Sequence, residues 1–339
     1  MAGENMNGSN IPKLISSEMA MLWNTYVADT AAVCCIQHYI NTYEDPEVLP
    51  VLEYALSIAQ NHIEDIRSLF KKENFPLPNG FNETDWSKEA PKLFSDVTYL
   101  RFMHHLGRTG LNAYSLAKSV SARRDVRSYF KKYYEQTEKL FDMASDAMEE
   151  KGYFIRSPYI DYPKKVKYVT DYHFLGGLVG KKRQLLAIEI AHLGTNIEVA
   201  NIAKTMLLAY SQVARQKEIS NYFKKGYDMS LEHVEYFLNV LKNDDVAYPS
   251  TWDGSLTDST ISPFSDRLMM FQIASITAIG VMDFGIAIGA SVRKDLAIRY
   301  AKMMAEVGTY ADDGAKIMID NGWLEKPPQS LDRQELRKK

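Results

Sequence analysis

Apolar residues recur along this chain at spacings of three and four, the pattern of helices that pack one face against a core. The segment 14–43 shows it clearly, because Leu22, Tyr26 and Val33 fall on one stripe. Pro46 is expected to begin the second helix, where its missing N–H costs nothing. The pattern as a whole predicts helices near residues 14–43, 46–73, 91–120, 124–151, 183–215, 217–242, 262–291 and 293–321.

The second half of the chain repeats the first. The separation between His62 and His233 equals that between Glu18 and Glu189, and the surrounding residues match without a gap. Further along, Phe94-Ser-Asp96 matches Phe264-Ser-Asp266 after the loss of one residue. Such a repeat indicates two copies of one structural unit. The predicted domains are a first four-helix bundle at 1–152, a linker at 153–182 and a second four-helix bundle at 183–339.

The connection between the second and third helices, Phe75–Pro91, is much longer than the other connections in its half. An extended residue spans about 3.3 Å, so a connection of this length can traverse a bundle from end to end. One long and two short connections favour the up-down-down-up path of the ferritin-like bundles. The predicted fold is therefore all-α, with two tandem ferritin-like four-helix bundles.

Composition and charge narrow the class of protein. The chain is 46% hydrophobic and 24% charged, which is typical of a globular protein, and its formal net charge of -3 gives no reason to expect a nucleic-acid partner. The only cysteines, Cys34 and Cys35, are adjacent, so a disulfide between them would be strained. We expect reduced thiols and a cytoplasmic location.

The apolar run 268–290 is long enough to cross a membrane. Its counterpart in the first half carries Arg101, His104 and Arg108, which would be costly in lipid. We therefore expect a buried helix and no membrane span.

Four polar side chains of the first half are candidates for a metal site. Asp29 falls on the apolar stripe of the first helix and His62 on that of the second. Counting about 1.5 Å per residue from the turns places the two at the same height, with His105 and Glu138 at a similar level. A carboxylate–histidine cluster at mid-height in a bundle suits iron or manganese.

The same count gives Glu198, His233, Asp283 and Glu306 in the second half. The two sets coincide only at His62 and His233, so one half at most is expected to bind metal. A buried Asp–His pair that is satisfied without a metal explains the same residues and remains the alternative.

The Glu189-Ile-Ala-His192 motif has the i, i+3 spacing of metal-binding pairs in helical bundles. It lies at the start of its helix, however, at the level of Arg293. We therefore favour ion pairs between Glu189 and Arg293 and, in the first half, between Glu18 and Arg123, and keep metal binding as the alternative.

Several motifs resemble a family of tandem ferritin-like proteins of spore-forming bacilli that is similar to spore coat protein F. The resemblance spans nearly the whole chain, and it rests on Asn61-His62-Ile-Glu64, Leu93-Phe-Ser-Asp96, Ala113-Tyr-Ser-Leu116, Glu189-Ile-Ala-His192, Thr251-Trp252-Asp253, Pro263-Phe-Ser-Asp266 and Asn321-Gly-Trp-Leu-Glu-Lys-Pro-Pro328. It implies the ferritin-like fold and no established activity. The Glu-Xaa-Xaa-His pairs of di-iron proteins are missing, because Ala59 and Ser230 precede the two histidines.

Three functions agree with these observations. The first is a stress- or spore-associated protein that binds iron or manganese weakly or not at all, with a second copy or spore-layer proteins as partners. The second is a mononuclear or di-metal oxidase. The third is a carrier that holds an apolar small molecule against the uncharged third helix of the second bundle.

Overall fold

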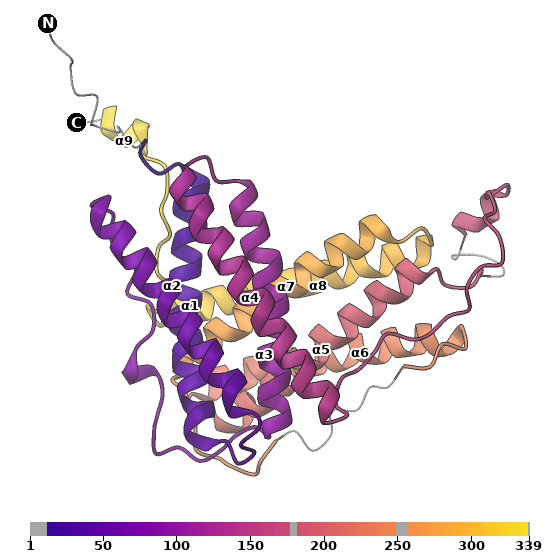
Figure 1. Cartoon of the computed structure of the whole chain (residues 1–339), viewed down its shortest axis with the longest axis horizontal. Coiled ribbons are helices and arrows are strands. Elements are labelled where there is room, and N and C mark those ends of the chain that lie inside the picture. Colours follow the sequence, from indigo (N-terminus) through magenta and orange to yellow (C-terminus); the bar gives the residue numbers. More distant parts are fainter. Residues whose placement is uncertain (1–11, 177–181, 249–255, 338–339) are drawn as a thin grey trace, which may run out of the picture.

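The structure of the chain is a computed structural model that describes residues 12–176, 182–248 and 256–337. Within these ranges the protein is all-α, and the long helices form two sets of four (Figure 1). These helices are α1 (Ser16–Thr42), α2 (Leu49–Lys72), α3 (Asp96–Ser119) and α4 (Arg124–Glu150) in the first half, and α5 (Ala187–Val213), α6 (Lys217–Asn243), α7 (Asp266–Ala290) and α8 (Lys294–Asp320) in the second. The described ranges also contain three short helices: the 3-10 helices η1 (Glu83–Asp85) between α2 and α3 and η2 (Tyr172–Leu175) between α4 and α5, and α9 (Arg333–Arg337) after α8.

The long helices lie where the periodicity predicts them. The prediction for Pro46 is wrong, because α2 begins at Leu49 and has Pro50 in its first turn instead. Helices α4 and α8 end before Gly152 and Gly322, whose φ angles of 72° and 68° are strained for residues with a side chain. The Thr251-Trp252-Asp253 motif lies outside the described residues.

Contacts between helix ends define the chain path of each half. In the first, Arg123 at the start of α4 pairs with Glu73 at the end of α2, with 2.8 Å between Nη1 and Oε1. Lys151, just after α4, pairs with Asp45 in the α1–α2 turn at 2.6 Å. Helices α2 and α4 are therefore antiparallel. Since α3 and α4 are joined by a tight turn, α2 and α3 run in the same direction.

The second half has the same path. Asp244 after α6 lies against Arg293 at the start of α8, with 3.4 Å between carboxylate and guanidinium. Asp266 at the start of α7 accepts the backbone N–H of Arg215 in the α5–α6 turn at 3.1 Å. Each half thus agrees with the up-down-down-up direction predicted from its loop lengths.

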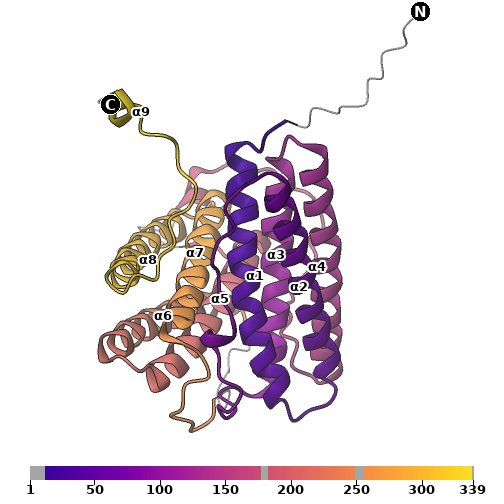
Figure 2. The same ribbon diagram turned by 90° about the vertical axis from the view of Figure 1, so that its left-hand side faces the viewer.

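The two halves pack across one another, with α1 and α3 of the first facing α5 and α7 of the second (Figures 1 and 2). Their long connections run side by side. The N–H of Ser87 donates to the carbonyl of Pro263 at 2.9 Å, and the N–H of Thr257 to that of Leu93 at 3.1 Å. After α8 the chain returns to the first half, where Glu325 accepts the N–H of Gly80 at 2.8 Å.

The buried apolar residues form three clusters, and the largest belongs to both halves. It contains α1, α2, α3 and α4 residues together with α5, α6, α7 and α8 residues, while a smaller cluster fills the far end of each half. Burial of apolar area between the halves stabilises their arrangement, because each Å² removed from water contributes about 25 cal/mol.

Helices α1 and α7 are long and apolar enough to cross a membrane by length and composition alone. Buried residues make up 44% of the most apolar window of α1 and 28% of that of α7. Core helices of soluble proteins pass the same test, so these two are weak evidence. The expected absence of a membrane span stays a prediction.

Candidate functional site

A cavity of about 220 Å³ lies between the two halves, where α1, α3, α5 and α7 meet. Its walls are mostly apolar, because the helices around it present small, aliphatic or aromatic side chains there. They include Ala28, Ala31, Ala32 and Ile36 from α1, Phe102, Met103 and Leu106 from α3, Ile202 and Met206 from α5, and Phe271, Ile276 and Ile279 from α7. An apolar cavity with a few polar groups is the usual form of a small-molecule site.

The alanines of α1 explain why space remains. Ala28 and Ala32 are one helical turn apart and both line the cavity, so at these two positions no large side chain of α1 fills the gap between the halves. Ser275 of α7 is exposed and lines the same cavity, which opens to solvent on this side.

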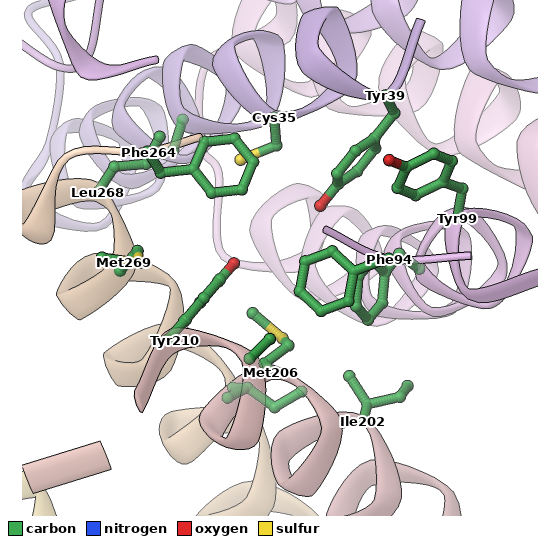
Figure 3. Close-up of a cluster of buried hydrophobic side chains, with 14 of the residues drawn as sticks. Cys35, Tyr39, Phe94, Tyr99, Ile202, Met206, Tyr210, Phe264, Leu268 and Met269 are labelled. Atoms are coloured by element: carbon green, nitrogen blue, oxygen red, sulfur yellow. The ribbon is translucent and has the colours of Figure 1, made fainter. Parts of the chain in front are cut away.

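Hydrogen-bonding groups from both halves meet at one wall. Gln272 of α7 bonds to the Cys35 thiol through Nε2 and to the Tyr210 hydroxyl through Oε1. Figure 3 shows Tyr210 of α5 reaching toward Cys35 and Tyr39 of α1. The Tyr39 ring stacks on Tyr99, with 4.3 Å between ring centroids. Burial raises the pKa of Cys35 far above its usual range, so the thiol is protonated and unreactive.

His105 and Thr109 supply a second polar wall. They lie one turn apart on α3, and both line the cavity. His105 is 8% exposed, and neither of its ring nitrogens has a hydrogen-bond partner among the described residues. The Thr109 hydroxyl also lacks one within the described part of the chain. Burial, with help from the charge of Arg108, lowers the pKa of His105 to about 4, so its ring is neutral at pH 7.

A cluster of charges joins the halves beside this cavity. Arg108 of α3 lies 3.0 Å from Asp283 of α7 and 3.6 Å from Glu198 of α5, and His104 lies 3.3 Å from Glu198. Burial raises the pKa of Asp283 despite Arg108. Burial would also raise the pKa of Glu198, but the bond from His104 and the charge of Arg108 outweigh it, and the net shift is downward. Asp283 and Glu198 therefore serve the contact between the halves.

Asp29 and His62 meet in the first half as predicted. The carboxylate Oδ2 lies 3.2 Å from His62 Nδ1, and both residues are buried. The other ring nitrogen, Nε2, lies 3.0 Å from the Gln136 amide, and the ring packs on Tyr133 with 3.8 Å between centroids. Burial raises the pKa of Asp29, opposed by His62. Both ring nitrogens of His62 therefore have a partner within the protein.

The other predicted ligands do not join this pair. Glu138 is exposed on α4, and His105 faces the cavity between the halves. In the second half, His233 is buried and lies 3.7 Å from the more exposed Glu306, while Glu198 and Asp283 are held by Arg108. The predicted four-residue clusters are thus corrected: among the described residues, no three His, Cys, Asp or Glu side chains form a group that could hold a metal ion.

Glu189 and Glu18 cap helices rather than forming the predicted ion pairs. Glu189 accepts the backbone N–H of Arg293 at 3.0 Å, and its guanidinium partner is Arg183 at 2.7 Å. Glu18 accepts the backbone N–H of Arg123 at 2.7 Å. The predicted partner residues are correct, but the contacting atoms are main-chain.

His192, half-buried on α5, does not join Glu189 in a metal-binding group of three among the described residues.

Elemental analysis decides between iron or manganese binding and a buried Asp29–His62 pair without metal. With two candidate ligands at Asp29 and His62, we expect protein purified without chelator to carry less than about a tenth of an equivalent of either metal. A content near one equivalent in the wild type, lost in His62→Ala and kept in His233→Ala, would contradict this expectation.

Sequence reasoning missed the cavity, although one signal pointed to its neighbourhood. Arg108 and His104 stand in the first-half counterpart of an almost uncharged helix, and a buried cation needs a partner. Asp283, the only acid in the apolar run 268–290 of the second half, is the partner.

Comparisons with known proteins identify a family and a similar solved structure. The model of the family described as "Protein of unknown function (DUF3231)" matches residues 1–166 and again residues 173–336. A solved structure of a "putative spore coat protein" from Bacillus halodurans C-125 is similar at 17% identity and a TM-score of 0.42, covering 44% of this chain and 98% of that chain. No curated protein matches the chain.

Proposed function

We propose that this chain, which belongs to the family of proteins of unknown function DUF3231 and carries two copies of its pattern, is a binding protein for an apolar small molecule. The observation that supports the proposal is the cavity of about 220 Å³ whose apolar walls come from both halves. An engineered apolar cavity of about 150 Å³ holds benzene, so the site suits a ligand of roughly nine non-hydrogen atoms.

The chemistry of the walls favours holding a ligand over transforming it. The Cys35 thiol is protonated, the Gln272 amide is bonded to Cys35 and Tyr210, and the pKa of His105, lowered to about 4, makes its ring a weak base. A nucleophile would need a lowered pKa or an adjacent base. This proposal develops the carrier function predicted from the sequence and moves the ligand from the second bundle to the boundary between the halves.

Ethylbenzene, a neutral probe of suitable size, tests the site by isothermal titration calorimetry. The free energy gained by burying its carbons, reduced by the free-energy cost of association, predicts one site with a dissociation constant on the order of 0.1 mM. Ser275→Trp should weaken binding at least about tenfold, because the indole would occupy the mouth of the cavity, where Ser275 is exposed.

Ala274→Trp is the matched control, since Ala274 is the exposed neighbour of Ser275 and does not line the cavity. It should bind ethylbenzene as the wild type does. Absence of binding heat in the wild type, or equal affinity in the two tryptophan variants, would rule out this site.

Each half is proposed to be ferritin-like. The up-down-down-up path and the long connection between the second and third helices support this assignment. The domain limits 1–152, 153–182 and 183–339 are likewise proposals. Limited proteolysis tests them, since a linker at 153–182 should be cut before the helices.

The biological setting stays a proposal that rests on the sequence motifs. A cytoplasmic location, association with spore-layer proteins, a homo-oligomer and the absence of a nucleic-acid partner are all expected from the sequence. Fractionation of sporulating cells with an antibody against the chain tests the location. Light scattering of the purified protein tests the oligomeric state.

A further inference from the structure

The cavity between the halves contains two polar side chains that the protein itself leaves unused. His105 is more than nine-tenths buried, and its two ring nitrogens have no partner among the described residues. Thr109 lies one turn further along α3, and its buried hydroxyl also has no hydrogen-bond partner among the described residues. A buried polar group without a hydrogen bond costs about 1–3 kcal/mol, so such groups ordinarily have a partner.

The other polar groups in this cavity and beside it do not satisfy them. Gln272 is bonded to Cys35 and to Tyr210. Arg108 points its guanidinium to Asp283 and Glu198, and His104 lies against Glu198. The two orphaned groups of α3 therefore face a cavity whose remaining lining is largely aliphatic and aromatic.

We propose that the ligand of this cavity is an uncharged amphiphile with a single hydroxyl or comparable polar group, which hydrogen-bonds to His105 and Thr109 while its apolar body lies against α1, α5 and α7. The inference rests on the proposed function. It names the chemical class of the ligand through the groups that would recognise it.

The electrostatics of the site select against charged ligands. A neutral imidazole offers one donor and one acceptor, and a threonine hydroxyl can act as either, so together they suit a hydroxyl group. An anion or a cation would lose its hydration without meeting an opposite charge, because the neighbouring Arg108 is already paired with two carboxylates.

The test compares three probes of similar size by calorimetry at pH 7: ethylbenzene, 4-ethylphenol and 4-methylbenzoate. A net hydrogen bond predicts that 4-ethylphenol binds the wild type about threefold to tenfold more tightly than ethylbenzene does. The anionic 4-methylbenzoate should bind more weakly than both.

Two variants test whether His105 and Thr109 cause the preference for 4-ethylphenol. Thr109→Val keeps the shape of the side chain and His105→Leu keeps a buried side chain of similar size. Each should reduce the preference for 4-ethylphenol and leave ethylbenzene binding within about twofold of the wild type. Asn112→Ala, at an exposed position on the same helix, is the control and should change neither. If His105→Leu fails to fold, Thr109→Val alone decides.

The possible outcomes distinguish a failure of this inference from a failure of the proposed function. If ethylbenzene binds and 4-ethylphenol gains nothing, the cavity is a ligand site and His105 and Thr109 are satisfied by water instead, which overturns the inference. A preference for 4-ethylphenol that survives in Thr109→Val and His105→Leu also overturns it. If no probe binds, the proposed function itself fails.

Discussion

Gly314→Ala should lower the free energy of unfolding by about 2–4 kcal/mol, since overpacking of a core costs about 1–3 kcal/mol and a hydrogen bond is strained as well. Tyr222 and Tyr310 stack between α6 and α8, with 4.2 Å between ring centroids and an interplanar angle of 3°. Each hydroxyl donates to the other residue's backbone carbonyl at 3.2 Å. A methyl group on Gly314 would overlap the Tyr222 hydroxyl and lie 2.8 Å from its Cζ.

Gly308→Ala is the matched control in the same helix. A methyl group there meets no atom within 4 Å, so this substitution should raise stability by about 0.5–1 kcal/mol, the helix-propensity gain. Urea unfolding followed by circular dichroism measures both variants. A Gly314→Ala protein as stable as the wild type would show that the tyrosine pair does not require the glycine.

The repeat supports this explanation. At the positions of Tyr222, Gly226, Tyr310 and Gly314 the first half has a different but complementary set: Val51, Ala55, Leu140 and Ala144, all buried. Two large residues pair with two glycines in one half, and two medium ones pair with two alanines in the other. Both sets fill the space between the second and fourth helices of their half.

Glu18→Ala should cost about 3–5 kcal/mol, since each buried N–H left without an acceptor costs about 1–3 kcal/mol. The Glu18 side chain is 0% exposed and accepts three backbone N–H groups: those of Ile15 at 3.0 Å, Ala122 at 2.9 Å and Arg123 at 2.7 Å. It therefore caps α1 and fixes the α3–α4 turn against it.

Glu18→Gln is the control for this carboxylate. It keeps the size of the side chain and one acceptor oxygen but places an amide N–H opposite a backbone N–H, so its cost should lie between zero and that of alanine. Denaturation midpoints of the wild type, Glu18→Ala and Glu18→Gln, measured at one pH, give the two costs. A loss below about 1 kcal/mol for Glu18→Ala would mean that water replaces the carboxylate.

The helices and the repeat could be predicted because their signals are local. The stripe through Leu22 and Tyr26 sets the inward face of α1, and the same stripe places Asp29 inward against His62. The heights of these two residues follow because both are counted along straight helices from the one turn that joins α1 and α2.

The remaining ligands could not be placed, because height alone does not give the direction of a side chain. Glu138 has the right height and faces solvent. Glu198 and Asp283 face inward but toward the other half, where Arg108 binds them. How one half packs on the other depends on the shapes of two assembled surfaces, and a repeat within one sequence carries no pattern for that contact.

The cavity escaped prediction for the same reason. Its walls come from four helices that are far apart in the chain, and the alanines of α1 read as ordinary helix formers. Only the packed halves show that these small residues leave space beside His105.

A crystal of the protein soaked with 1-bromo-4-ethylbenzene tests the central claim most directly, because anomalous scattering locates the bromine without reference to the surrounding atoms. We predict a bromine peak between α1, α3, α5 and α7, within the walls formed by Ala31, Met103, Ile202 and Ile276. The proposed ligand site would be contradicted if side chains of α1 and α7 closed this space and no bromine peak lay in it at a saturating concentration of the probe.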